Sequence, residues 1–411
     1  MNAFIIDAIR SPRAHGNQKS AFKSLTPITL GAHMLEQLAS RNQLNRARVE
    51  DVIVGCATQY GGQGSNFARL ITLAAGWPDT VAALSINRAC CSGLSAVSLA
   101  ALQVQAGAGV CVAGGVEMMS QVPLAADQGS LFFDSAFNQQ HGILPLGLAA
   151  DAIASRYGIS RAACDALAAR SQSRALAAQI AGKFTSMLPV LGQDGDVLLD
   201  KEQNLRPGNT EAYLSTLPPA FVEQARQYWQ SDESENSVEP GESGRTRRYQ
   251  IDQLQHVHHV GNSPTAADAA AWVLLASTEA IQQQHWTPRA RIVASVDCGA
   301  DPGLALTGVI DATRKVLARA GLTLADIDVF EINEAFAAAM LHWLASLQVD
   351  AERVNSNGGT LAFGHAMGAT GAILLCMALD ELEYRQGRYG LIAMSGAAGL
   401  ASAMVVERCF R

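Results

Sequence analysis

The chain has 411 residues, of which 49% are hydrophobic and 16% are charged. This length is enough to bury a large core and predicts two or three domains. The formal net charge of −7 argues against a nucleic-acid or polybasic membrane binder, and no stretch of about 18 or more apolar residues predicts a membrane span.

The N-terminus and the cysteines indicate a cytoplasmic protein. The first residues enter an apolar stretch with no basic segment before it, so we expect a β-strand there and no secretory signal. None of the eight cysteines forms a CxxC pair, and their density is too low for a disulfide scaffold. Most lie in apolar runs, where cysteine is usually a small buried residue. The adjacent pair Cys90 and Cys91 is the exception, because it lies in a turn of small residues.

The chain contains an internal duplication. Each copy predicts a short buried strand, a turn of small residues, an apolar helix and an apolar strand followed by glycine. These segments are 51–55, 90–93, 94–105 and 109–115 in the first copy, and 326–330, 368–371, 372–383 and 390–396 in the second. Strands that alternate with helices of this length predict right-handed βαβ units and parallel sheet. We therefore expect an α/β fold with two similar sheets and helices on both faces.

An insertion interrupts the first copy. The closing strand 401–406 follows the second copy almost at once, whereas the equivalent strand 269–275 follows the first only after a long detour. Such an insertion can cover a ligand site at the strand ends. The predicted division is an N-terminal half of residues 1–120 and 261–284, an inserted domain of residues 121–260, and a C-terminal half of residues 285–411.

Two features stand out within the insertion. Residues 160–178 have a helical pattern, with Ser160 as a suitable N-cap. Residues 231–248 are polar and almost free of apolar side chains, which is typical of a mobile surface loop.

Cys90 is the first candidate catalytic residue. It lies at the start of a predicted apolar helix, where unpaired backbone N–H groups and the helix dipole favour a thiolate. That position suits a nucleophile. The alternative is a buried structural thiol, in a turn whose small residues only allow close helix packing.

His365 and Asn333 are the candidates in the second copy. His365 precedes the helix start equivalent to the one beside Cys90, so a pseudo-two-fold packing of the halves would let the imidazole activate the thiol. Asn333 follows the strand 329–332, where a polar side chain can orient a water or a histidine. The alternatives are a structural histidine in a glycine-rich loop, and an asparagine that caps a helix from Ala335 onward.

A histidine cluster precedes the closing strand 269–275 of the first copy. His256, His258 and His259 form an HxHH pattern, which lacks partner ligands at a fixed spacing. This favours a surface or strand position over a metal site, and we expect no metal.

Together and in this order, the motifs resemble the thiolase family of acyl-CoA acyltransferases over nearly the whole chain. The matching segments are DAIRSP at 7–12, QGSNFAR at 63–69, the Cys90 turn, GGVEMMS at 114–120, YGISR at 157–161, RP at 206–207 through LPPAF at 217–221, GNS at 261–263, NEAF at 333–336, and the loop of Gly364 and His365. The resemblance implies the thiolase-like fold. In that fold, duplicated βαβαβαββ halves form a five-layered α/β/α/β/α core with an inserted loop domain.

The resemblance also implies roles for the candidate residues. Cys90 would be acylated by an acyl-CoA or a 3-ketoacyl-CoA. His365 would activate Cys90 and help to hold the thioester oxygen, and Asn333 would fix a water in the same oxyanion hole. The backbone N–H groups of Cys90 and Ala397 would form a second oxyanion hole.

The resemblance further implies the partners. The loop domain would bind coenzyme A as a co-substrate, with Leu146, Arg206 and Ser263 as expected contacts. No tightly bound cofactor is expected. The family is dimeric or tetrameric, so we expect a homodimer or homotetramer.

Ser395 is the main departure from the family pattern. It falls where thiolases carry a second cysteine, which takes the α-proton of acetyl-CoA. A thiol has a pKa of about 8.5, an alkyl hydroxyl is far less acidic, and losing a matched acid/base typically costs roughly 10²–10⁴-fold in rate. A water, a neighbouring group or Cys91 would have to compensate. Leu146, Ala366 and Pro264 also replace residues that are common in the family.

These features predict a thiolase, which converts 3-ketoacyl-CoA and coenzyme A into acyl-CoA and acetyl-CoA, or runs the reverse Claisen condensation, through acyl-Cys90. Two alternatives stay open. Because Ser395 replaces the second cysteine, the chain could be a Cys-His-Asn condensing enzyme or an acyl-CoA hydrolase. It could also be a non-catalytic coenzyme A-binding partner subunit that kept the fold.

Overall fold

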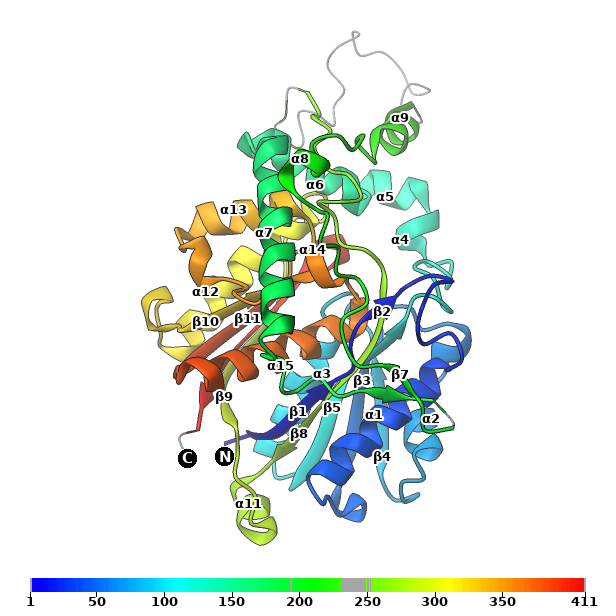
Figure 1. The fold of residues 1–411 in the computed structure, drawn as a ribbon, viewed down its shortest axis with the longest axis vertical. Coiled ribbons are helices and arrows are strands. Elements are labelled where there is room, and N and C mark those ends of the chain that lie inside the picture. Colours follow the sequence, from blue (N-terminus) through cyan, green and yellow to red (C-terminus); the bar gives the residue numbers. More distant parts are fainter. Residues whose placement is uncertain (1, 193, 231–248, 250, 252, 410–411) are drawn as a thin grey trace.

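The computed structural model describes residues 2–192, 194–230, 249, 251 and 253–409 (Figure 1). The predicted mobile stretch 231–248 lies outside these residues. Within them, the strands form one 10-stranded mixed sheet and a separate 2-stranded one.

The large sheet is duplicated like the sequence. Its N-terminal half has the order β4 (Ala82–Ile86), β3 (Asp51–Gly55), β5 (Val110–Met118), β8 (Ala267–Ala276) and β1 (Phe4–Arg10). Its C-terminal half has the order β10 (Val329–Ile332), β11 (Tyr389–Ser395), β12 (Leu400–Arg408) and β9 (Ala290–Gly299). β1 joins the halves, because Phe4 and Ile5 pair with Arg291 and Ala290 of β9.

The strand directions differ from the expected parallel sheets. β3 is parallel to β4 and β5, and β10 is parallel to β11, as the βαβ units predict. The closing strands β8 and β12 are antiparallel to their neighbours, so the expectation of parallel sheet is wrong for them. β12 follows β11 through a short turn, residues 396–399, and so short a connection can only reverse the chain.

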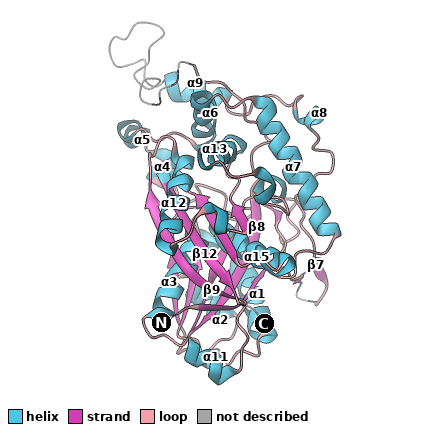
Figure 2. Cartoon of the chain, turned by 90° about the vertical axis from the view of Figure 1, so that its left-hand side faces the viewer, coloured by secondary structure: helices cyan, strands magenta, loops and turns pink. Residues whose placement is uncertain are grey.

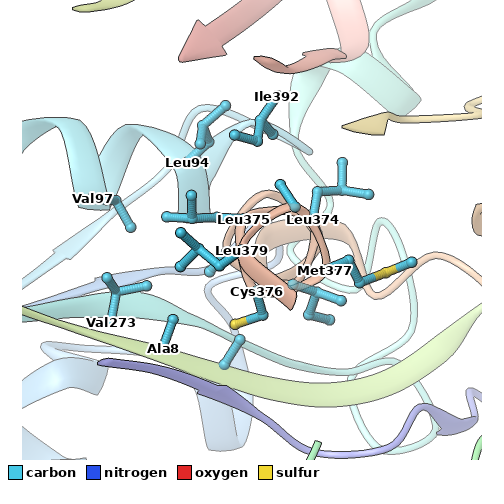
Figure 3. Packing of buried hydrophobic residues seen from close by; sticks show 14 of the residues in the cluster. Ala8, Leu94, Val97, Val273, Leu374, Leu375, Cys376, Met377, Leu379 and Ile392 are labelled. Atoms are coloured by element: carbon cyan, nitrogen blue, oxygen red, sulfur yellow. The ribbon is translucent and has the colours of Figure 1, made fainter. Parts of the chain in front are cut away.

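The predicted layers are confirmed. α3 (Ser92–Gln105) and α15 (Met367–Arg385) lie between the two half-sheets and contact strands of both. All residues from Gly368 to Leu382 are buried, as expected of a helix surrounded by core. Figure 3 shows this helix end-on, with apolar side chains from α3, β1, β8 and β11 around it. α1 (Pro27–Arg41) and α2 (Phe67–Ala74) cover the outer face of the N-terminal half, and α12 (Gly308–Ala320) that of the C-terminal half.

The insertion supplies most of the remaining elements. The predicted helix at 160–178 is α7 (Arg161–Ile180), and the Ser160 side chain accepts the backbone N–H of Ala163 as its N-cap. Figures 1 and 2 place α5, α6, α8 and α9 together at one end of the molecule, beyond the sheet. The other elements are β2 (Ala14–His15), α4 (Ser130–Phe133), α5 (Ser135–His141), α6 (Leu146–Tyr157), β6 (Val190–Leu191), β7 (Val197–Leu199), α8 (Glu211–Leu214), α9 (Val222–Gln230), α11 (Thr278–Gln284), α13 (Ala337–Leu347) and α14 (Thr360–Phe363). No helix in the described part of the chain is long and apolar enough to cross a membrane.

One predicted strand begins later than expected. Residues 326–330 are predicted as a strand, but β10 begins at Val329. The preceding residues 324–326 form a 3-10 turn, in which the Asp326 carboxylate accepts the backbone N–H of Thr323 at 2.8 Å. This local side-chain bond takes residues 324–326 out of the strand.

Candidate active site

The starts of α3 and α15 meet through glycine. A Cβ on Gly93 would lie 2.5 Å from the carbonyl oxygen of Gly368, and a Cβ on Gly371 would lie 2.5 Å from the backbone nitrogen of Leu94. Only hydrogen fits at either position. The small residues of both turns therefore do serve close helix packing, and this packing brings the segments before the two helices together.

A cavity of about 270 Å³ lies at this junction. Cys90 lines it from the N-terminal half, and His365 and Ser395 line it from the C-terminal half. The insertion adds Leu124 and Leu146 to the lining. The structure thus brings together in one cavity a thiol and an imidazole that are 275 positions apart in the printed numbering, 365 − 90.

Cys90 holds a buried, protonated thiol. Burial, with a smaller contribution from the Glu117 charge, raises the pKa of Cys90 to about 12. Hydrogen bonds from the backbone N–H groups of Cys90 and Ala397 act in the opposite direction. The expected thiolate-favouring effect of the helix start is therefore outweighed, because α3 begins only at Ser92 and burial dominates. The thiol needs a base before it can act as a nucleophile.

His365, which lines the same cavity, is the candidate for that base, while the printed neighbour of the Cys90 sulfur is the thioether sulfur of Met367 at 3.6 Å. Its backbone N–H donates to Thr265 at 2.8 Å, and its Nδ1 lies 2.8 Å from the Thr370 hydroxyl. Burial, with a contribution from the Arg13 charge, lowers the pKa of His365 to about 4, so the imidazole is neutral at pH 7. Its Nε2 is buried and has no hydrogen-bond partner among the described residues.

Asn333 supplies a second buried group without a partner. Its backbone N–H donates to Ala393 at 2.9 Å, and its Oδ1 accepts from the Thr360 hydroxyl at 3.0 Å. Its Nδ2 has no partner in the described part of the chain. The capping alternative is wrong, because α13 begins at Ala337 with Phe336 as its N-cap. A buried amide donor held in this way is suited to an oxyanion or an ordered water.

Ser395 and Cys91 have different surroundings. Ser395 is the last residue of β11, is buried, and lines the cavity. The Cys91 thiol instead lies 3.8 Å from the carbonyl oxygen of Met394, and Cys91 is not among the residues that line the cavity. Cys91 is therefore a poor substitute for the missing second cysteine.

Glu117 is a buried carboxylate whose role the sequence did not predict. It accepts the backbone N–H groups of Ala57 at 2.7 Å and Gly368 at 2.9 Å, and the side-chain amide of Gln63 at 2.8 Å. It thereby fixes the start of α15, next to His365. The available signal was a single charged residue inside β5, every residue of which is buried. Burial raises the pKa of Glu117, and the N–H donors oppose that shift.

The expected coenzyme A contacts lie in two adjoining cavities. Leu146 lines the cavity that contains Cys90. Arg206 and Ser263 line a second cavity of about 430 Å³. The two share the wall formed by residues 264–266.

His258 and His259 are buried outside the strands, so the surface or strand interpretation is wrong for them, whereas His256 is half-buried. His258 Nδ1 lies 2.7 Å from an oxygen of Asp151, and His259 Nε2 lies 2.7 Å from an oxygen of Asp165. These contacts attach the end of the insertion to α6 and α7. His256 also faces Asp151, at 2.9 Å. Among the described ranges, no group of three or more His, Cys, Asp or Glu residues could hold a metal ion.

Comparison with known proteins agrees with these observations. Residues 3–226 match the thiolase N-terminal domain, and residues 286–408 match the thiolase C-terminal domain. The chain is 36% identical to the 3-oxoadipyl-CoA/3-oxo-5,6-dehydrosuberyl-CoA thiolase of Escherichia coli K12, over 99% of each chain. It is 36% identical to the steroid 3-ketoacyl-CoA thiolase FadA6 of Mycobacterium tuberculosis, over 99% of this chain and 94% of that one. A 3-ketoacyl-CoA thiolase of Cronobacter sakazakii is 36% identical over 98% of each chain.

Proposed function

The chain belongs to the thiolase family of acyl-CoA acyltransferases, and we propose that it carries out thiolysis of 3-ketoacyl-CoA, or the reverse condensation, through acyl-Cys90. One observation carries the assignment of the residues. A neutral thiol and a neutral imidazole line the same cavity, and the imidazole Nε2 and the Asn333 amide are buried without partners. Buried polar atoms are normally hydrogen-bonded, so an unpartnered imidazole nitrogen of a residue that lines a cavity supports a ligand site there.

In the thiolysis direction, the Cys90 sulfur attacks the 3-keto carbon while its proton moves to Nε2 of His365. Because the pKa is about 12 for the thiol and about 4 for the imidazole, proton transfer must accompany the attack. The negative charge that develops on the keto oxygen is stabilised by the protonated Nε2 and by Asn333, through a water as the family resemblance implies.

Cleavage of the bond between C2 and C3 leaves its electron pair on C2, which must gain a proton to become acetyl-CoA. Ser395 is too weak an acid for this step. The protonated His365 is a strong acid, because its surroundings hold its pKa at about 4. We therefore assign this proton to His365, delivered directly or through the Ser395 hydroxyl as a relay.

The acyl group then leaves as a new thioester. The thiol of coenzyme A attacks the carbonyl carbon of acyl-Cys90 and gives its proton to His365. Collapse of this intermediate breaks the bond to the Cys90 sulfur, which takes the proton back. The backbone N–H groups of Cys90 and Ala397, whose hydrogen bonds favour the ionised sulfur, would stabilise charge in this step.

Coenzyme A would occupy the second cavity. The cationic side chain of Arg206 lines it and suits a phosphate, and the buried hydroxyl of Ser263 has no partner among the described residues. The pantetheine arm would pass the shared wall at 264–266 to reach Cys90.

The proposal is tested by supplying the purified chain with acetoacetyl-CoA or longer 3-ketoacyl-CoAs and free coenzyme A. We expect loss of the 3-ketoacyl absorbance and, when coenzyme A is omitted, an intact-mass increase equal to the acyl group on Cys90. Absence of both signals at every chain length would reject the proposal.

We further propose a homodimer, or a homotetramer built from it, through the edge of the N-terminal half-sheet. β4 ends the strand order, and Leu84 on β4 and Leu73 on the adjacent α2 are exposed. An apolar strand edge of this kind is a template for pairing with a second copy. Sedimentation of the wild-type chain and of Leu84→Lys tests this, since the variant should dissociate.

We also propose a cytoplasmic location, which agrees with eight cysteines that are all free. The division into residues 1–120 with 261–284, 121–260 and 285–411 is proposed for the same chain. Limited proteolysis, with cleavage expected first between residues 121 and 260, tests the division.

A further inference from the structure

The cavity beside Cys90 is almost entirely apolar. Its side chains outside the reacting groups are mostly thioether, aliphatic or aromatic. They include Met119, Leu124, Leu146, Leu306, Phe336 and Met367. No lysine or arginine is among the described residues that line it. The reacting groups Cys90 and His365 are both neutral at pH 7.

The nearby cations are engaged elsewhere. Arg13 is buried and pairs with Glu202 at 2.7 Å, and Arg88 pairs with Asp297 at 2.7 Å. Neither lines the cavity. The buried carboxylate of Glu117 lies close enough for its charge to act on the Cys90 thiol. The field beside Cys90 is therefore unfavourable for a second carboxylate.

From this lining we propose that the acyl site takes uncharged 3-ketoacyl chains and excludes chains that end in a carboxylate. The inference rests on the proposed function, because it concerns the acyl group that Cys90 would carry. The names of the relatives divide between oxoadipyl-CoA and 3-ketoacyl-CoA thiolases, so family membership leaves the acyl end undetermined. A carboxylate that leaves water with no cation to pair with is strongly disfavoured, whereas a methyl end gains by burial.

The test compares acyl chains of matched length on the full chain. The substrates are 3-oxohexanoyl-CoA, 3-oxoadipyl-CoA, which has a carboxylate at C6, and the methyl ester of 3-oxoadipyl-CoA. We expect kcat/KM to be at least about 100-fold higher for the hexanoyl chain than for the adipyl chain, and the neutral ester to be accepted like the hexanoyl chain. Comparable turnover of the adipyl and hexanoyl chains would overturn the inference and leave the proposed function intact. Absence of thiolysis and of Cys90 acylation with all three would overturn the proposed function itself.

A pair of variants at Leu146 sharpens the test. Leu146 is half-buried at the first residue of α6, so a longer side chain can enter there without breaking the core. Leu146→Arg should shift the adipyl-to-hexanoyl ratio of kcat/KM toward the adipyl chain by at least about tenfold, and the matched neutral variant Leu146→Gln should keep the wild-type ratio. Thermal unfolding of both variants confirms that each is folded. The same ratio in folded Leu146→Arg and Leu146→Gln would contradict the placement of the acyl end beside Leu146.

Discussion

The two halves of the molecule share one plan and present different chemistry. In the N-terminal half the chain enters α3 through Ala89, whose φ is 48°, and Cys90 directly precedes the N-cap Cys91. In the C-terminal half the short α14 comes first, and His365 lies in the loop before α15. The duplicated packing brings the two helix starts together, and a few residues of local difference decide which group each presents. The two halves therefore have the same fold but present different reactive groups.

Removing the Cys90 sulfur should have the largest effect on activity, because it takes away the reactive group of the N-terminal half. Cys90→Ala leaves the C-terminal half intact with nothing to activate, so we expect kcat to fall by about 10⁴–10⁶-fold. Intact mass should detect no acyl-enzyme. The matched control is Cys91→Ala, in which acylation should persist because the Cys91 thiol faces Met394. Acylation of Cys90→Ala combined with its loss in Cys91→Ala would reverse the assignment of the nucleophile.

Removing the imidazole should have the next largest effect. In His365→Asn the thiol loses its base, and we expect kcat/KM to fall by about 10²–10⁴-fold. Because the pKa of Cys90 is about 12, the residual rate should rise about tenfold per pH unit as the thiolate fraction grows. The wild-type rate should stay nearly level between roughly pH 6 and 8, since His365 is neutral there. A residual rate of His365→Asn that is independent of pH would contradict the role of His365 as base.

The same substitution affects stability with a definite sign. The pKa of His365 is about 4 in the folded chain, below the ordinary value of 6.5. The unfolded chain therefore binds more protons between these values, and the stability contributed by the neutral imidazole is lost as pH falls from about 6.5 to 4. Tm should drop more steeply over this range in the wild type than in His365→Asn. Parallel Tm curves would contradict the buried neutral state.

Much of the fold followed from the sequence for local reasons. Runs of apolar residues with glycine after them located β3, β5, β11 and both central helices, because strand and helix periods appear directly in the spacing of side chains. The motifs around Cys90 and His365 selected two residues that line the same cavity, and the motif around Asn333 selected a buried amide with an unpartnered Nδ2 among the described residues.

Other features depend on the three-dimensional surroundings of a residue, which the spacing of residues along the sequence does not show. The direction of β12 is set by the length of its turn, and burial, rather than the helix start, dominates the pKa of Cys90. The buried position of His258 depends on its partner Asp151, 107 positions earlier in the chain. The role of Glu117 depends on Gly368, from the opposite half.

Ser395→Cys should give the C-terminal half a second proton donor for C2, beside His365. A thiol is far more acidic than the serine hydroxyl, so we expect thiolysis to rise by about 10–100-fold if protonation of C2 limits the rate. The matched control is Ser395→Ala, which removes the relay. It should lower the rate several-fold, which corresponds to the free energy of about one neutral hydrogen bond. Stopped-flow measurement of 3-ketoacyl loss separates this step from release of acyl-CoA. Equal rates for all three residues would assign the proton to His365 alone.

Glu117→Gln tests the contact between the two halves. Of these substitutions it should have the smallest effect on the reaction rate. Both carboxylate oxygens accept N–H groups, one from Ala57 and Gly368 and the other from Thr58 and Gln63. The NH₂ group of glutamine therefore faces donors in either orientation, and we expect unfolding to become easier by about 1–3 kcal/mol. Because the Glu117 charge raises the pKa of Cys90, its loss should lower that pKa and speed alkylation of Cys90 by iodoacetamide at fixed pH. Exposed Glu279 on α11 provides the matched control, since Glu279→Gln should change neither quantity appreciably. Slower alkylation of a folded Glu117→Gln variant would contradict the electrostatic link, and an unchanged Tm would contradict the role of Glu117 in joining the two halves.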